Sequence, residues 1–356
     1  MNEQAIKCVM SRLATGGNGS YTVGKPLAYK ALGVCPIHVS VDSKVEYLTY
    51  EEALEKKTVT VSELDQGGSV PELRLENKGD EQILIIDGEQ LVGAKQNRVM
   101  NTTMLIAAHS KIVIPVSCVE QGRWHYEGSR RMSSSPSNLY AGTRAMKSRQ
   151  VARNLQADRK YDADQGAIWH DISCRLHQES VHSPTSAMDD HFSSRMGTLD
   201  EFYQHLALDR FEGDRSTLAG AVFTLSGKIL GMDVFDRAST FEKQWRKLLN
   251  SYAIEALTSD GEGYVDSDDV REFLQSVGGS EMEVFDPPGL GDDVRITDEN
   301  SVGSALVVDG TVLHLYAFKV KDGGSRGREG ESRQTTRISD FSDRVRRRRN
   351  RRGDVD

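Results

Sequence analysis

Charged and polar side chains that suit anion binding gather in two short segments, residues 87–103 and 114–124. The first segment reads DGEQLVGAKQNRVMNTT and the second IPVSCVEQGRW. Burying a charge without a partner is costly, so such a cluster is expected either to pair internally or to surround a ligand. Both interpretations remain open from the residues alone.

The cations of this cluster have the right chemistry to hold phosphate. Lys95, Arg98 and Arg123 would contact phosphate oxygens, the arginines through their two-pronged guanidinium groups. Trp124 would offer a flat face for a base to stack on. These four residues are therefore candidate ligand-binding residues for a nucleotide-like anion.

The amides and carboxylates of the same segments complete the candidate site. Gln96, Asn97 and Asn101 would bond ribose hydroxyls or a base edge, because an amide both donates and accepts hydrogen bonds. Glu89 and Glu120 are the candidate catalytic residues, an acid/base pair for cleaving a glycosidic or phosphate bond. The same two carboxylates could equally orient the arginines.

The elements that must position these residues indicate an α+β fold. Residues 28–122 contain short β-branched segments, typical of antiparallel strands in a β-sandwich-like half. Residues 123–320 mix helices with two β-hairpins, whose turns fall at Ser226-Gly227 and Asp309-Gly310. A third apolar-flanked turn is expected at Asp87-Gly88, directly before Glu89. Strands first, then helices and hairpins, favour one compact α+β body.

One predicted helix, residues 143–157, carries much of the local positive charge. Its apolar positions would be buried, with Arg144, Lys147 and two further arginines facing solvent. Residues 123–160 hold nine basic and two acidic residues, so this strip could steer an anion toward the cluster. An ordinary solvated helix face is the competing interpretation.

The ends of the chain differ from this body. Residues 1–27 are expected to form an N-terminal arm, and residues 321–356 a disordered Arg-rich tail, because the tail has few apolar residues to bury. Seven arginines within residues 344–352 could bind a polyanion weakly.

Composition narrows the class of protein. The chain has 356 residues, 37% of them hydrophobic, and a net charge of −8. No apolar run reaches the roughly 20 residues needed to cross a bilayer, so no membrane partner is expected. The four cysteines are scattered without CxxC pairs, which favours reduced thiols and a cytoplasmic location.

The two polar segments, followed by AVFTLSGKILGMDVF and ALVVDGTVLHLYAF, resemble the ADP-ribosylglycohydrolase and rhodanese-phosphatase-associated domain family. The resemblance runs from about residue 28 to residue 318. It implies a link to ADP-ribosyl and phosphate metabolism, in a family whose own activity is unassigned. The leading hypothesis is therefore binding or processing of an ADP-ribose or nucleotide-like anionic metabolite. The alternative is a non-enzymatic sensor or interaction module whose polar cluster is structural.

Two further patterns resemble metal sites. Residues 258–269 resemble a calcium loop, but Thr258 and Asp269 stand where an acid and a bidentate Glu are needed. His170, Cys174 and His177 share one helix side at zinc-like spacing, without a second signature. We therefore predict neither a metal nor a cofactor.

Overall fold

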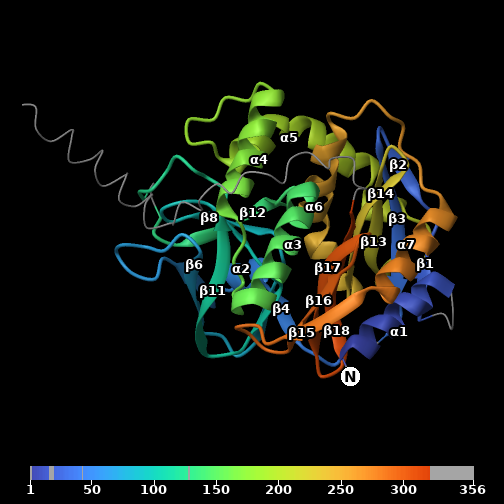
Figure 1. Cartoon of the computed structure of the whole chain (residues 1–356), viewed down its shortest axis with the longest axis horizontal. Helices are drawn as coiled ribbons and strands as arrows, with labels where there is room; N and C mark the ends of the chain where they lie inside the picture. Colours follow the sequence, from blue (N-terminus) through green and yellow to red (C-terminus); the bar gives the residue numbers. More distant parts are fainter. Residues whose placement is uncertain (1, 16–19, 42, 127–128, 321–356) are drawn as a thin grey trace, which may run out of the picture. The chain divides into compact units, whose positions relative to one another are not determined.

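A large antiparallel sheet combines strands from both ends of the chain (Figure 1). This computed structural model describes residues 2–15, 20–41, 43–126 and 129–320. The sheet has the order β1-β3-β13-β14-β18-β17-β16-β15, with β2 also paired to β3. Its strands are β1 (Tyr21–Val23), β2 (Leu27–Tyr29), β3 (Leu32–Val39), β13 (Leu218–Leu225), β14 (Lys228–Phe235), β15 (Glu281–Phe285), β16 (Asp292–Thr297), β17 (Ser301–Val308) and β18 (Thr311–Lys319).

Two smaller sheets enclose a separate apolar core with a short helix, α2 (Tyr50–Glu55). One has the order β10-β7-β4, in which β4 and β7 are parallel, and the other has the order β12-β8-β9-β11-β6-β5. Their strands are β4 (Tyr47–Thr49), β5 (Val59–Ser62), β6 (Glu72–Asn77), β7 (Gln82–Ile85), β8 (Glu89–Gly93), β9 (Arg98–Met100), β10 (Met104–Ile106), β11 (Ser110–Cys118) and β12 (Met132–Asn138). The predicted α+β class is confirmed. However, β3 lies in the large sheet beside β13, not among these strands.

Helices cover both faces of the large sheet. Adjacent residues of β3 point into different cores, Val34 toward one and Cys35 toward the other. The Cys35 side is covered by α1 (Asn2–Thr15) and α7 (Ser267–Gly279), which lie side by side in Figure 1. On the other side, α3 (Ala141–Asp158) and α6 (Ala238–Ala256) pack against the sheet, and α4 (Gln165–Gln178) and α5 (Met188–His205) add apolar side chains to the same core. Short 3-10 turns, Leu208–Arg210 and Arg215–Thr217, precede β13.

Both predicted hairpins are present. Ser226 and Gly227 connect β13 to β14, and Asp309 and Gly310 connect β17 to β18, each pair with positive φ at both residues. The turn at 87–88 is also present, but it is not a hairpin, because β7 and β8 pair within different sheets. It therefore joins the two smaller sheets and places Glu89 at the start of β8.

The predicted solvent-facing side of the 143–157 helix is wrong in part. Arg144 and Lys147 of α3 are completely buried, because Asp233 of β14 and Asp87 of the turn before β8 meet them inside the body. Arg123 is also buried and paired, so these three cations do not form part of a surface strip.

The N-terminal segment is more ordered than an arm. Residues 2–15 form α1, whose apolar side is buried against α7 and the large sheet. The predicted tail, residues 321–356 with its 344–352 arginine run, lies outside the described residues. Within the described residues, every helix is too short or too polar to span a membrane.

Candidate functional site

The two polar segments meet in the six-stranded sheet. Arg98 of β9 pairs with Leu91 of β8 on one side and with Cys118 of β11 on the other. The connection between β8 and β9 therefore contacts the segment that follows β11. This arrangement brings together seven of the nine predicted site residues: Lys95, Gln96, Asn97, Arg98, Glu120, Arg123 and Trp124.

Glu120 and Arg123 form a buried two-pronged ion pair. Nε and Nη2 of Arg123 donate to the two carboxylate oxygens of Glu120 at 2.8 and 2.7 Å. Arg123 Nη1 also donates to the carbonyl of Ala94 at 2.8 Å, and Thr185 donates to Glu120 at 3.0 Å. This pair clamps the two segments together, and its head groups are occupied by the protein itself.

The predicted ligand-binding amides are also engaged within the protein. Gln96 Nε2 donates to the backbone carbonyl of Glu120 at 2.9 Å. Asn97 Oδ1 accepts from Gly93 N–H at 3.0 Å and from Arg123 Nη2 at 3.2 Å. Both amides therefore brace the loop rather than face a ligand.

Glu89 and Asn101 lie apart from these contacts. Glu89 is fully buried and accepts from Lys247 Nζ of α6 at 2.7 Å. Asn101 donates to the carbonyl of Tyr161 at 2.8 Å and accepts from Ser117 Oγ at 2.7 Å. Glu89 and Glu120, the predicted acid/base pair, are thus held in separate ion pairs.

Lys95, Arg98 and Trp124 form a third group of predicted site residues, in which both cations lie over the tryptophan ring. Lys95 Nζ donates to the carbonyls of Gln66 and Gly67 at 2.5 and 2.6 Å, and Arg98 Nε donates to Val70 at 3.1 Å. The Trp124 ring centroid is 5.2 Å from Lys95 Nζ and 5.6 Å from Arg98 Cζ. A loop of backbone carbonyls, residues 64–70, therefore caps both cations.

Arg98 is the least compensated cation of this group. It is fully buried, and its Nη2 atom has no hydrogen-bond partner among the described residues. Burial lowers the pKa of the Arg98 guanidinium, because removal from water disfavours its charged form. Arg123, by contrast, has a carboxylate directly against it.

A second charged cluster, not predicted from the sequence, lies where α3 meets the large sheet. This buried charge network consists of Asp87, Arg144, Lys147, Asp233 and His314, all completely buried. Arg144 Nη2 lies 2.7 Å from Asp233 Oδ1, and Lys147 pairs with Asp87. His314 Nε2 is 3.2 Å from the same Asp233 oxygen. The available sequence signal was a titratable residue inside an apolar strand, as in GMDVF and VLHLY.

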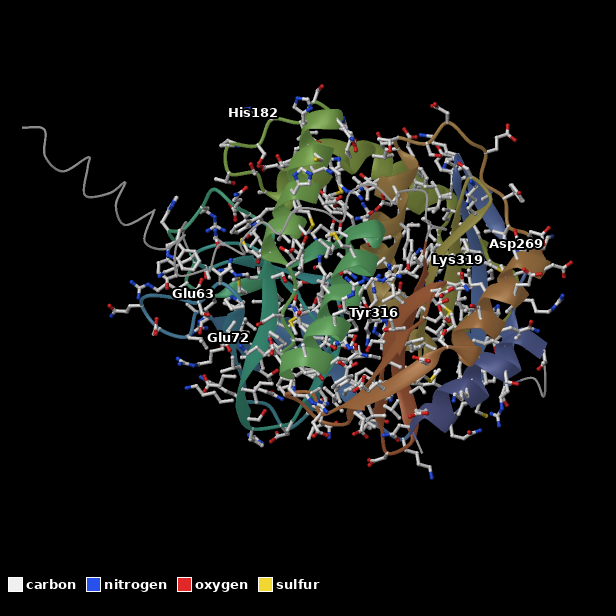
Figure 2. All side chains as sticks on the ribbon, in the orientation of Figure 1. Glu63, Glu72, His182, Asp269, Tyr316 and Lys319 are labelled. Carbon is white, nitrogen blue, oxygen red and sulfur yellow. The ribbon has the colours of Figure 1, made fainter. Side chains whose placement is uncertain are left out.

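Burial and neighbouring charges shift the pKa values of Asp233 and Lys147 within the buried charge network. Burial by itself would raise the pKa of Asp233, but Arg144 and His314 outweigh it and lower that pKa to about 2. Burial lowers the pKa of Lys147 to about 8, although Asp87 opposes this shift. The ring of Tyr316, labelled near the middle of Figure 2, lies 5.3 Å from Arg144 Cζ.

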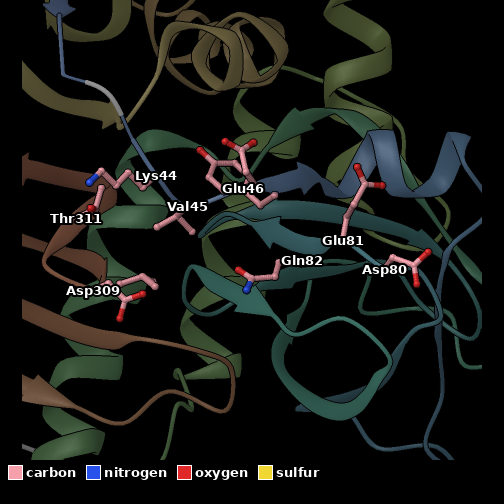
Figure 3. Close-up of a pocket in the computed structure, with 10 residues that line it drawn as sticks. Lys44, Val45, Glu46, Asp80, Glu81, Gln82, Asp309 and Thr311 are labelled. Atoms are coloured by element: carbon pink, nitrogen blue, oxygen red, sulfur yellow. The ribbon is translucent and has the colours of Figure 1, made fainter.

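A pocket of about 590 Å³ opens elsewhere, between the 44–47 segment and the turns at 80–82 and 308–311 (Figure 3). Its lining carries four carboxylates and one lysine. That charge does not suit an anion, and none of the predicted site residues lines the pocket. Its lining residues are Lys44, Val45, Glu46, Tyr47, Asp80, Glu81, Gln82, Val308, Asp309 and Thr311.

The calcium-like pattern spans the connection between α6 and α7 together with the start of α7, and the zinc-like pattern lies along α4. Asp266 caps α7 by accepting from the backbone N–H groups of Asp268 and Asp269. On α4, Cys174 Sγ lies 3.6 Å from His170 Nε2. Across the described part of the chain, no three His, Cys, Asp or Glu residues are grouped to hold a metal ion.

Comparison with known proteins gives one match. The family model described as ARG and Rhodanese-Phosphatase-superfamily-associated Protein domain (ARPP-1) matches residues 20–318. No curated protein and no solved structure matches the chain.

Proposed function

The chain belongs to the ARG and Rhodanese-Phosphatase-superfamily-associated Protein domain family, and from that premise we propose that it binds an anionic, phosphate-bearing metabolite. The ligand is of the nucleotide or ADP-ribose type. Lys95 and Arg98 hold its phosphate, and Trp124 stacks against its base. All four cysteines are free thiols, which fits the proposed cytoplasmic location.

The observation that carries this proposal is the unpartnered Nη2 atom of buried Arg98. A buried charged donor without an acceptor is costly, so the site gains free energy when an anion supplies that acceptor. Within the described chain, neither Lys95 nor Arg98 hydrogen-bonds a carboxylate. Their charges are therefore available to a ligand, whereas the charge of Arg123 is not.

Ligand entry requires the 64–70 loop to exchange its contacts. The backbone carbonyls of Gln66, Gly67 and Val70 occupy the positions that phosphate oxygens would take. Gln66 and Gly67 are exposed, so the loop can move without uncovering a core. An ammonium or guanidinium group binds an anionic phosphate oxygen more strongly than a neutral carbonyl oxygen, and this difference drives the exchange.

Calorimetric titration with ADP-ribose tests the proposal. Lys95→Gln should weaken binding at least about tenfold, because a hydrogen bond to a charged group contributes about 1.5–3 kcal/mol. Lys30→Gln is the matched control, since Lys30 is exposed and pairs with Glu201 at 2.7 Å. It removes the same charge and should leave the affinity unchanged. Wild-type protein that gives no heat with ADP-ribose, NAD or ADP contradicts the proposal.

A sensor or interaction module with a purely structural cluster is the second candidate. The buried Glu120–Arg123 pair favours it, because its head groups are fully used within the protein. Under this alternative, Lys95→Gln changes thermal stability but no ligand raises the melting temperature of wild type. A specific ligand would raise it by mass action.

A further inference from the structure

Glu63 carries an unused carboxylate oxygen beside Lys95. It follows β5, is 6% exposed, and is labelled in Figure 2. Its Oε1 accepts from the backbone N–H of Lys95 at 3.1 Å, whereas Oε2 has no hydrogen-bond partner among the described residues. A buried carboxylate oxygen without a donor is costly. Glu63 is not among the site residues predicted from the sequence.

The free oxygen of Glu63 and the ammonium of Lys95 converge on one point of the 64–70 loop. A Cβ atom added at Gly68 would lie 3.0 Å from Glu63 Oε2 and 3.3 Å from Lys95 Nζ. Gly68 also has φ +74°, which a residue with a side chain rarely adopts. An acceptor and a cation thus face the same small space, which the loop backbone fills.

We propose that Glu63 determines specificity by accepting a hydrogen bond from a ligand hydroxyl next to the phosphate held by Lys95 and Arg98. This inference rests on the proposed function. It narrows the ligand class to hydroxyl-bearing phosphate compounds such as ribose phosphates.

The chemistry of Glu63 and Lys95 predicts that plain phosphate binds less tightly than a phosphate with a neighbouring hydroxyl. A carboxylate repels a neighbouring anion but binds a hydroxyl through a charge-assisted bond. A ligand without the hydroxyl leaves Glu63 Oε2 buried and unpaired, so the site rejects it. Lys95 and Arg98 supply attraction for the phosphate, and Glu63 supplies discrimination among phosphates.

Wild-type protein provides a first test that needs no variant. Calorimetry compares ribose 5-phosphate with pentyl phosphate, which has a similar carbon chain but no hydroxyl. Ribose 5-phosphate should bind about tenfold more tightly, the effect of one hydrogen bond to a charged acceptor. Equal affinities overturn the role of Glu63 while leaving anion binding intact.

The Glu63→Gln variant supplies the second test. It keeps an oxygen for the Lys95 N–H and removes the charged acceptor. The preference for ribose 5-phosphate over inorganic phosphate should shrink about tenfold, partly because phosphate binds more tightly once repulsion is removed. The control is Glu72→Gln, because Glu72 is exposed on β6 (Figure 2) and its loss changes the net charge equally.

The outcomes separate the two proposals. A reduced preference in Glu63→Gln but not in Glu72→Gln supports the inference, provided circular dichroism shows both variants folded. An unchanged preference in Glu63→Gln overturns it. Wild type that binds neither ADP-ribose nor ribose 5-phosphate overturns the proposed function itself.

Discussion

Charged side chains inside this protein divide into paired and unpaired groups. Arg144, Asp233 and Lys247 each lie within 3 Å of an oppositely charged atom, whereas Arg98 and Glu63 retain a polar atom without a partner. Removing one member of a buried pair is strongly destabilising, because the other charge is left without compensation. The paired residues therefore maintain the fold, and the unpaired residues are the ones a ligand can satisfy.

Asp233 is expected to make the folded protein less stable as the pH falls into the acid range. Its pKa is about 2 in the folded protein, against about 3.9 in an unfolded chain. A carboxylate whose pKa is lowered by folding stabilises the folded protein. This stabilisation is complete at pH values above the pKa of the group in the unfolded chain, and it is lost as the pH falls through the pKa of the group in the folded protein. The contribution is about 3 kcal/mol. Urea unfolding at a series of pH values from about 5 to about 2 measures it.

Two variants check this assignment. Asp233→Asn should lower stability at neutral pH and flatten the acid part of the pH profile, because the titrating group is gone. Asp209→Asn, at an exposed position, should leave the profile as in wild type. An Asp233→Asn protein with the wild-type acid slope would show that other carboxylates dominate.

At the level of elements, the sequence predicted those features that depend on neighbouring residues. Ser226-Gly227 and Asp309-Gly310 specify their hairpins locally, because both need positive φ. The 143–157 helix was predicted from its periodicity, but the burial of Arg144 was not, since its partner Asp233 lies 89 residues away. The candidate site residues were likewise predicted as a group, because their side-chain types suit anion binding. Which of them pair with each other depends on side-chain geometry that one sequence does not reveal.

Two glycine-to-alanine substitutions that should change stability in opposite directions test the role of turn geometry. Gly310→Ala should destabilise by about 1 kcal/mol, because Gly310 has φ +77°. A Cβ there meets nothing within 4 Å, so backbone strain is the sole cost. Gly197→Ala also meets nothing within 4 Å but lies exposed within α5, where alanine should stabilise by about 0.5–1 kcal/mol. Chemical unfolding measures the change in unfolding free energy for both variants. Changes of the same sign would contradict this explanation.

Over the whole described body, buried ion pairs connect the sheet systems. Lys147 of α3 reaches Asp87 between the two smaller sheets, and neighbouring Arg144 reaches Asp233 in the large sheet. Lys247 of α6 reaches Glu89, 158 residues earlier in the chain. Such long-range pairs, like the pairing of β3 with β13, could not be predicted because nothing local specifies them.

These connections predict one cooperative unfolding transition. Trp124 and Trp245 report on different sheet systems, so tryptophan fluorescence and far-UV circular dichroism should change together in urea. Lys247→Met should lower the unfolding free energy by about 3–5 kcal/mol, because Glu89 is left buried and unpaired. Lys243→Met on the same helix loses only a partly exposed pair with Glu52 and should change it by less than about 1 kcal/mol. Separate wild-type transitions would contradict the coupling.

The partnership of β3 with β13 has a consequence for the newly made protein. Residues 32–39 leave the ribosome long before residues 218–225, against which they align. At 5–20 residues per second, synthesis of the intervening chain takes about 10–35 s. Throughout that time β3, a strand with six buried apolar or proline side chains, has only the short strands β1 and β2 along one edge, and the edge that β13 will cover stays unpaired. The nascent chain is therefore expected to depend on chaperones that shield strand edges until translation is nearly complete.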